Sequence, residues 1–497
     1  MKVRYNRIST SAPVHHGIKK TPEKKQFTNI KKVDVVPFNQ RISNAAKDKN
    51  LSVALQQWDR LGELNATPTP HTFCAMVNAF VRCGQLSRAE EFVDKMEKSI
   101  PLTSLTREGY LVTLTTLLKG YFMSSAFSRA HSLFQKLVRI SEDSVGSRTL
   151  DTYLRGCLRT GAFDEGLQAF HSTSTQKSDM STLYAAKMLS IKLAVKSVSE
   201  VGGTEDASLC VHIGCAYVRL GKLERAKEWF TRARELLFTS APERQFDKLQ
   251  KSELVRICDF FAADQAHTFT KSLDVYIERF IVISGNPSEQ VQLWRSLGLH
   301  KYRSEEEICS LAECAIKKFQ ESITGSNSVV LEVCSGSGEW IAREASSNRE
   351  TLYIASEFRF DRCVDILTRQ VFQQLDNLWV LCGDAREVAK IVPVKSLDHF
   401  HVNYPEPPPV NSAHIEEAMS SDVVTKKFLR DIRSLIKGEL HIVSDDKLYI
   451  HSVSNLVNDV WNTEVFPKSS KTLVDSYFAR FFSKKAKRWS IDVAVSV

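Results

Sequence analysis

A pattern that recurs in the first half of the chain constrains its fold most. A small residue is followed four positions later by an aromatic or aliphatic residue, and three positions after that by Leu or Met. Full copies have their small residue at positions 54, 89 and 130, and weaker copies, which keep only the aromatic residue four positions on, begin at 166 and 226. Since positions four and seven residues on share one face of a helix, each copy predicts a helix with one apolar face.

Glycines and large apolar residues divide each copy into two helices. Gly84, Gly161 and Gly221 stand five residues before a small position. A large apolar residue stands sixteen residues before it, at Phe38, Phe73, Leu114 and Leu150. Each unit therefore predicts a helical hairpin with a glycine turn. One hairpin cannot bury its apolar face alone, so the units predict an all-α solenoid over residues 37–240.

The units resemble pentatricopeptide repeats, most clearly over residues 70–77, 84–96 and 112–137. That resemblance implies binding of single-stranded RNA, with bases read from positions such as Gln40, Ala75 and Thr116. The unit at 221–230 is equally similar to tetratricopeptide repeats, which usually bind peptides. The spacing of about 35 residues favours RNA, and a protein partner or a plain helical scaffold stays as an alternative.

From about residue 326 the pattern changes to short apolar runs separated by amphipathic stretches. The runs lie at 329–333, 352–355, 378–381, 397–402 and 440–443. Such alternation predicts a mostly parallel α/β sheet, in which ligands bind at the carboxyl ends of the strands.

Residues suited to a nucleotide follow the first three predicted strands. Gly336 and Gly338 form a turn after the first strand, Glu357 ends the second, and Asp384 follows the third. A glycine turn lets a nucleotide approach the backbone, and carboxylates accept ribose hydroxyls and the adenine amino group. Each feature alone is as often a plain turn or a helix cap. A dinucleotide fold is an alternative, but Ile341 stands where its motif needs a third glycine.

Four segments together resemble the tRNA (guanine-N7)-methyltransferase family, namely residues 331–338, 354–364, 377–385 and 403–407. The resemblance covers about residues 300–497 and implies a Rossmann-like class I methyltransferase domain that uses S-adenosyl-L-methionine. It implies catalytic roles for Glu406 and Asp445, and contact of Asp445 and Ser476 with the RNA substrate. It implies cofactor contacts by Glu332, Gly336, Gly338, Glu357, Asp384, Ala385 and Glu406.

Several positions depart from the family pattern. Cys334 stands at the first glycine of the loop, Pro408 and Val410 replace a tryptophan and a lysine, and Ala479 replaces a glutamate. Most of these changes affect positions that the resemblance assigns to the guanine and the tRNA, whereas the positions assigned to the cofactor are better kept. An alternative function is therefore an RNA-binding pentatricopeptide protein with a catalytically diverged methyltransferase domain.

Charge and cysteine content bear on the partners and the compartment. Residues 1–36 hold nine Lys or Arg against two acids, which supplies +7 of the net charge of +9. They predict a disordered basic head that suits a transit peptide, a phosphate-binding tail or a solvated terminus. Eleven cysteines include no Cys-x-x-Cys pair, so we expect free thiols in an intracellular, reducing compartment and no metal site.

The predicted organisation is multidomain. A basic head over 1–36 precedes repeats over 37–240, a helical connector over 241–300 and the methyltransferase domain over 301–497. We expect a soluble protein with RNA as partner, tRNA in particular, because no apolar run approaches the ~18 residues of a membrane span. Mitochondrion, plastid, nucleus and cytoplasm stay open as locations.

Overall fold

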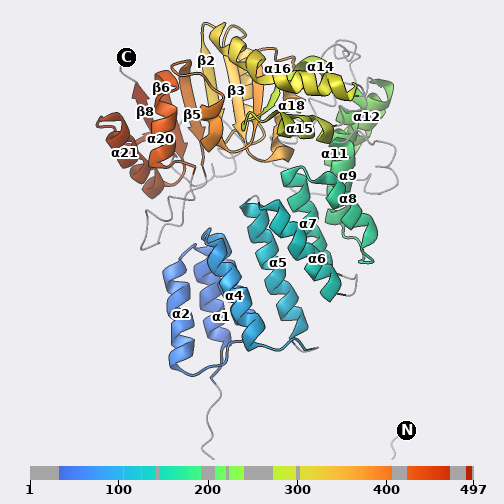
Figure 1. The fold of residues 1–497 in the computed structure, drawn as a ribbon, viewed down its shortest axis with the longest axis vertical. Coiled ribbons are helices and arrows are strands. Elements are labelled where there is room, and N and C mark those ends of the chain that lie inside the picture. The colour runs from blue at the N-terminus through green and yellow to red at the C-terminus, as the bar shows by residue number, and fades with distance from the viewer. Residues whose placement is uncertain are drawn as a thin grey trace, which may run out of the picture.

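The computed structural model describes residues 33–103, 106–124, 126–141, 145–191, 207–219, 223–239, 273–297, 303–405, 423–470 and 488–494. Paired helices form the N-terminal part, and a sheet flanked by helices forms the C-terminal part (Figure 1). The helices of the N-terminal part are α1 (Val36–Lys47), α2 (Leu51–Glu63), α3 (Pro70–Arg82), α4 (Leu86–Ser99), α5 (Arg107–Met123), α6 (Phe127–Ile140), α7 (Ser147–Thr160), α8 (Phe163–Ser172), α9 (Asp179–Ile191), α11 (Ala207–Arg219) and α12 (Leu223–Thr239).

The repeat pattern corresponds to a row of stacked hairpins, as predicted. The first helices of successive hairpins pack in series, α1 on α3, α3 on α5, α5 on α7 and α7 on α9. The small residues Ala54, Ala89, Ala130 and Ala226 are completely buried. Gly84 and Gly161 have φ angles of 71° and 79°, which residues with a side chain rarely adopt, so these two turns depend on glycine.

One position predicted to read a base is wrong. Ala75 is buried in the core between the helices, with 7% of its surface exposed, and its methyl group therefore cannot reach a ligand. Gln40 is exposed and Thr116 is partly exposed. Spacing along the sequence placed all three at one level of the hairpin but did not resolve which side of the helix each one occupies.

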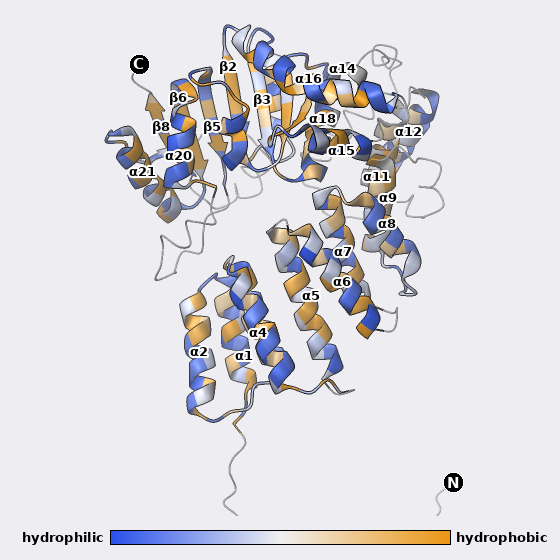
Figure 2. Ribbon diagram, in the orientation of Figure 1, coloured by the Kyte–Doolittle hydropathy of each residue, from blue (hydrophilic) through white to orange (hydrophobic). Residues whose placement is uncertain are grey.

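The C-terminal part is an eight-stranded sheet with helices on its faces. Its strands are β1 (Phe280–Val282), β2 (Val329–Val333), β3 (Leu352–Glu357), β4 (Leu378–Cys382), β5 (Leu397–Asn403), β6 (Ile436–Ser444), β7 (Lys468–Ser470) and β8 (Arg488–Ala494). Its helices are α14 (Leu273–Glu278), α15 (Pro287–Ser296), α16 (Glu305–Thr324), α17 (Glu339–Ser347), α18 (Phe360–Gln373), the 3₁₀ helix η3 (Ala385–Lys390), α20 (Lys426–Arg433) and α21 (Lys447–Trp461). Figure 2 shows the central strands as mainly hydrophobic, whereas the surrounding helices carry hydrophilic faces.

The strand order is β1-β4-β3-β2-β5-β6-β8-β7, parallel from β1 to β6 and antiparallel at β8 and β7. The five predicted strands are confirmed as β2 to β6. The chain runs outward from β2 through β3 to β4 and then returns to place β5 beside β2. The order therefore reverses between β2 and β5, which is where such sheets bind ligands.

Strand β1 is an addition that the sequence analysis did not predict. Phe280–Val282 lies within the stretch 241–300, which was expected to be a helical connector, and pairs in parallel with β4. The sheet therefore begins before residue 301. A run of three residues is too short to stand out from the helical stretches around it.

The repeats pack directly on the sheet part. The ring of Phe163 in α8 meets the ring of Phe360 at the start of α18 edge-on, with centroids 5.4 Å apart. Helix α7 also contacts α18, and buried apolar residues of both parts belong to one continuous core. Among the described residues, no helix has both the length and the apolar character needed to cross a membrane.

Candidate active site

A cavity of about 1820 Å³ lies between the carboxyl ends of the sheet strands and the turns of the repeats. Its sheet side includes Glu357, Asp384, Ala385, Tyr404 and Asp445. Its repeat side includes Arg82, Gly84, Met123, Arg159, Gly161 and Phe163. A ligand in this cavity would touch both parts of the chain.

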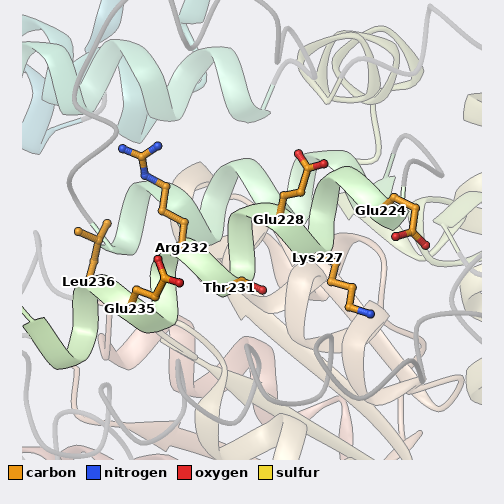
Figure 3. Close-up of a pocket in the computed structure, with 7 residues that line it drawn as sticks. All are labelled: Glu224, Lys227, Glu228, Thr231, Arg232, Glu235 and Leu236. Atoms are coloured by element: carbon orange, nitrogen blue, oxygen red, sulfur yellow. The ribbon is translucent and has the colours of Figure 1, made fainter.

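A second hollow, of about 800 Å³, runs along α12 (Figure 3). All of its lining residues belong to that one helix, and most of them are charged: Glu224, Lys227, Glu228, Thr231, Arg232, Glu235 and Leu236. No strand end reaches it. The candidate site is therefore the cavity at the strand ends.

The loop between β2 and α17 bends through three left-handed residues. Cys334, Gly336 and Gly338 have φ angles of 60°, 57° and 75°. Glycine adopts this conformation freely, whereas for a residue with a Cβ it costs about 1–2 kcal/mol. The backbone at Cys334 is therefore strained, whereas a glycine, which the tRNA (guanine-N7)-methyltransferase family has at this position, would not be strained.

Glu357 holds the glycine loop against the end of β3. Its carboxylate accepts hydrogen bonds from the backbone N–H of Gly336 at 2.9 Å, Phe358 at 3.0 Å and Arg359 at 2.9 Å. Burial raises the pKa of Glu357, against the lowering effect of Arg362, whose guanidinium lies 3.7 Å away. An acceptor fixed in this way at the cavity wall suits the hydroxyl groups of a ribose.

Glu332 lies beneath the loop, among the buried residues and not among those that line the cavity. Asn403 at the end of β5 donates to its Oε1 at 2.6 Å, which joins β2 to β5 at the point where the strand order reverses. Its Oε2 is buried and has no hydrogen-bond partner among the described residues. Burial raises the pKa of Glu332 to about 7.

Asp384 begins η3 and forms its N-terminal cap. Its carboxylate accepts from the backbone N–H of Arg386 at 2.9 Å and from the guanidinium of the same residue. Burial acts to raise the pKa of Asp384, but these hydrogen bonds outweigh it and the pKa is lowered. Asp384 therefore stays ionised and able to accept a hydrogen bond at the cavity wall.

Two adjacent acids after β6 have different roles. Asp446 caps α21 by accepting from the backbone N–H of Leu448 at 2.9 Å and of Tyr449 at 3.0 Å. Asp445 does not cap the helix, and both acids line the cavity. Burial and the neighbouring charge of Asp446 raise the pKa of Asp445.

Tyr404 and Arg159 are cavity residues that the sequence analysis missed. Tyr404 follows β5 with a φ of 50°, and its hydroxyl is buried without a partner among the described residues. The guanidinium of Arg159, in α7, lies 4.7 Å from the centre of the Phe358 ring. Its Nε is also buried without a partner in the described part of the chain. Tyr404 could have been found by its position at a strand end, whereas no sequence signal connects Arg159 to the sheet.

The structure thus brings Glu357, Asp384, Ala385 and Asp445 together around one cavity. Gly336 and Gly338 shape the adjacent loop, and the buried Glu332 accepts a hydrogen bond from Asn403. Glu406 and Ser476 lie outside the described residues, as does most of the predicted basic head.

Comparisons with known proteins divide the chain in the same way. Residues 326–490 match the model of a family described as putative methyltransferase, and residues 71–99 match that of the PPR repeat. A tRNA (guanine-N(7)-)-methyltransferase of Chlamydia pneumoniae is 27% identical over 34% of this chain and 76% of the relative. The enzyme of the same name from Chlamydia muridarum is 30% identical over 29% of this chain and 65% of the relative. Among solved structures, the 16S rRNA methyltransferase KamB aligns at 13% identity and a TM-score of 0.29, over 36% of this chain and 94% of its own.

Proposed function

We propose that the chain is a tRNA (guanine-N7)-methyltransferase, because residues 326–490 match a family of putative methyltransferases and residues 71–99 match the PPR repeat. It transfers a methyl group from S-adenosyl-L-methionine to N7 of a guanine in tRNA, and its repeats bind the RNA. The observation that carries the proposal is the cavity that joins the acids at the strand ends to the turns of the repeats.

The residues present fit the methyl donor. Glu357 and Asp384 stand at the ends of neighbouring strands and offer carboxylate oxygens to the cavity, which suits the ribose hydroxyls and the adenine amino group of a nucleoside. Gly336 and Gly338 carry no side chains at two positions of the loop before α17. S-adenosyl-L-methionine supplies an electrophilic methyl group on a sulfonium centre.

The protein's part in the reaction is to position the guanine. N7 of guanine has a free lone pair, so no general base has to remove a proton before the methyl group is transferred. Asp445 accepts hydrogen bonds from the N1–H and amino groups of the base, which fixes its orientation and stabilises the positive charge that develops on the ring. We propose the same role for Glu406.

A group of cations on the first helices of the repeats supports RNA as the ligand. Burial and the positive charges of Arg82, Arg155 and Arg148 lower the pKa of Lys119. These residues come from α3, α5 and α7, whose packing brings them together. Like charges gathered in this way suit the phosphates of a nucleic acid. Arg82 also lines the cavity, so the group extends to the candidate site.

The catalytic proposal is tested by comparing Asp445→Asn with Asp446→Asn in methyl transfer to total tRNA. Loss of charge-assisted hydrogen bonds worth about 1.5–3 kcal/mol lowers kcat roughly 10- to 200-fold in Asp445→Asn, while the Kd for the methyl donor is unchanged. Asp446→Asn keeps its activity, because Asn caps a helix as well as Asp does. Equal activity of wild type and Asp445→Asn would exclude the proposed role.

The RNA-binding proposal is tested by the double variant Arg148→Glu and Arg155→Glu. We expect weaker binding of tRNA and a salt dependence that is less steep by about one unit for each phosphate that the variant no longer neutralises. Arg225→Glu is the matched control, since Arg225 is exposed on α12 and pairs with Glu228. Unchanged binding by the double variant, together with capture of a peptide ligand, would favour a protein-binding scaffold.

A further inference from the structure

Three polar side chains meet on one face of the sheet, on the adjacent strands β5 and β6. His399 lies on β5 opposite Glu439 of β6, and His441 stands two residues after Glu439. Since alternate residues of a strand point to the same face, Glu439 and His441 share a side of the sheet. Together, His399, Glu439 and His441 present two imidazoles and one carboxylate.

The spacing of their donor atoms matches that of ligands around one metal ion. Glu439 Oε2 lies 3.5 Å from His399 Nδ1 and 3.2 Å from His441 Nε2. All three donor atoms lie within 4.8 Å of one another. Bonds of about 2.05 Å around a tetrahedral zinc ion place its ligand atoms roughly 3.3 Å apart. Two of the three separations therefore already fit, and the third is below 4.8 Å.

A second carboxylate orients one of the imidazoles. Asp492 of β8 lies opposite His441, and its Oδ1 is 2.9 Å from His441 Nδ1. Holding a proton on Nδ1 leaves the lone pair of Nε2 directed toward Glu439. A carboxylate behind a histidine in this way is the usual second partner of a metal-bound imidazole. The side chains of His399, Glu439 and His441 are 41%, 49% and 22% exposed, so an ion can reach them.

We propose that His399, Glu439 and His441 bind one divalent transition-metal ion, with zinc as the best match. Two imidazoles and a carboxylate suit zinc and its neighbours, whereas calcium and magnesium prefer oxygen ligands alone. The site is structural, because His399 precedes the end of β5 by four residues, or roughly 13 Å. The ion would tie β5 to β6, which carry Tyr404 and Asp445 at their far ends.

The spacing of the cysteines predicted no metal site, but the spacing of cysteines does not bear on a site built from histidines and a glutamate. His399 and His441 are separated by more than 40 residues, and parallel pairing of β5 with β6 brings them together. The signal is therefore the sheet register, which no local motif reveals.

The test is titration of the metal-depleted full-length chain with Co²⁺ alone, followed by visible absorption. We expect one equivalent to give the intense bands of a tetrahedral ion without a thiolate charge-transfer band, and Zn²⁺ but not Mg²⁺ to displace it. Glu439→Gln and the double variant His399→Ala with His441→Ala should lose these bands. Asp492→Asn should bind about 10- to 100-fold more weakly.

His451→Ala is the matched control, because His451 is an exposed histidine on α21 outside the cluster. It should bind Co²⁺ like the wild type, and circular dichroism checks that every variant is folded. Glu439→Gln has nearly the shape of the native side chain, so it tests the site even if the double variant unfolds. Tetrahedral bands that persist in Glu439→Gln, or a wild type that gives none, would overturn the proposal.

Discussion

Replacing Glu332 with Gln changes how the stability of the protein depends on pH. The carboxyl group is buried, Asn403 donates to one of its oxygens at 2.6 Å, and its other oxygen has no partner among the described residues. Burial raises the pKa from 4.5 to about 7 in the folded protein. The folded state therefore holds this proton more tightly than the unfolded state does. The stability that Glu332 contributes is fully present below pH 4.5 and is lost as the pH rises through about 7.

The magnitude follows from the two pKa values. A separation of about 2.5 pH units corresponds to about 3 kcal/mol in total, most of which is lost between pH 5 and pH 8. Gln resembles the protonated acid and does not ionise. We therefore expect Glu332→Gln to exceed the wild type by about 1 kcal/mol at pH 5 and by about 3 kcal/mol at pH 8 in the free energy of unfolding.

The assay is urea unfolding of the full-length chain at both pH values, followed by tryptophan fluorescence. Glu350→Gln, at an exposed glutamate, controls for the loss of one negative charge. If Glu332→Gln and the wild type lost the same free energy between pH 5 and pH 8, the buried carboxyl would not be the group that titrates. Burial of the Glu332 carboxyl would then not raise its pKa in the folded protein.

Three further substitutions test packing and backbone geometry. Cys334→Val should lower the free energy of unfolding by about 1–3 kcal/mol, because a branched side chain is strained at a φ of 60°; a result equal to wild type in urea unfolding would refute the strain. Gly156→Ala should cost about 1–3 kcal/mol, since a Cβ would lie 2.3 Å from the ring of Phe122. Gly62→Ala is the control and should not lower the free energy of unfolding, because nothing lies within 4 Å of its added Cβ. Equal thermal midpoints for Gly156→Ala and Gly62→Ala would contradict the packing of the repeats. Phe163→Ala should cost about 3–5 kcal/mol and speed hydrogen exchange at the start of α18, because it removes the ring that meets Phe360; unchanged exchange there would show that the two parts do not support each other.

The sequence predicted those parts of the fold that depend on local patterns. Small residues such as Ala89 and Ala130 recur at helical spacing because only they allow the paired helices to approach closely, and both are completely buried. The runs of β2 to β4 are mostly apolar because these strands are buried along their whole length, with helices on both faces of the sheet. Strand β1 was missed, since its three residues gain their role only by pairing with β4.

The candidate site was predicted on the sheet side and missed on the repeat side. Glu357, Asp384 and Asp445 follow strands directly, so the rule that parallel strands end at one edge was enough to group them. The position of Arg159 over Phe358 depends on how the fourth hairpin packs on α18. Contacts between distant segments leave no periodicity in a single sequence, and the same reason explains why the cluster of His399, Glu439 and His441 was not predicted.

The most direct test of the central claim is to identify the methylated product. Full-length wild type and Glu406→Ala are incubated with methyl-labelled S-adenosyl-L-methionine and total tRNA, and the tRNA is digested to nucleosides for mass spectrometry. The account predicts label in 7-methylguanosine with the wild type and its loss with Glu406→Ala. Binding of the methyl donor without transfer, or label on another nucleoside, would contradict it and favour an RNA-binding repeat protein whose methyltransferase domain has another role.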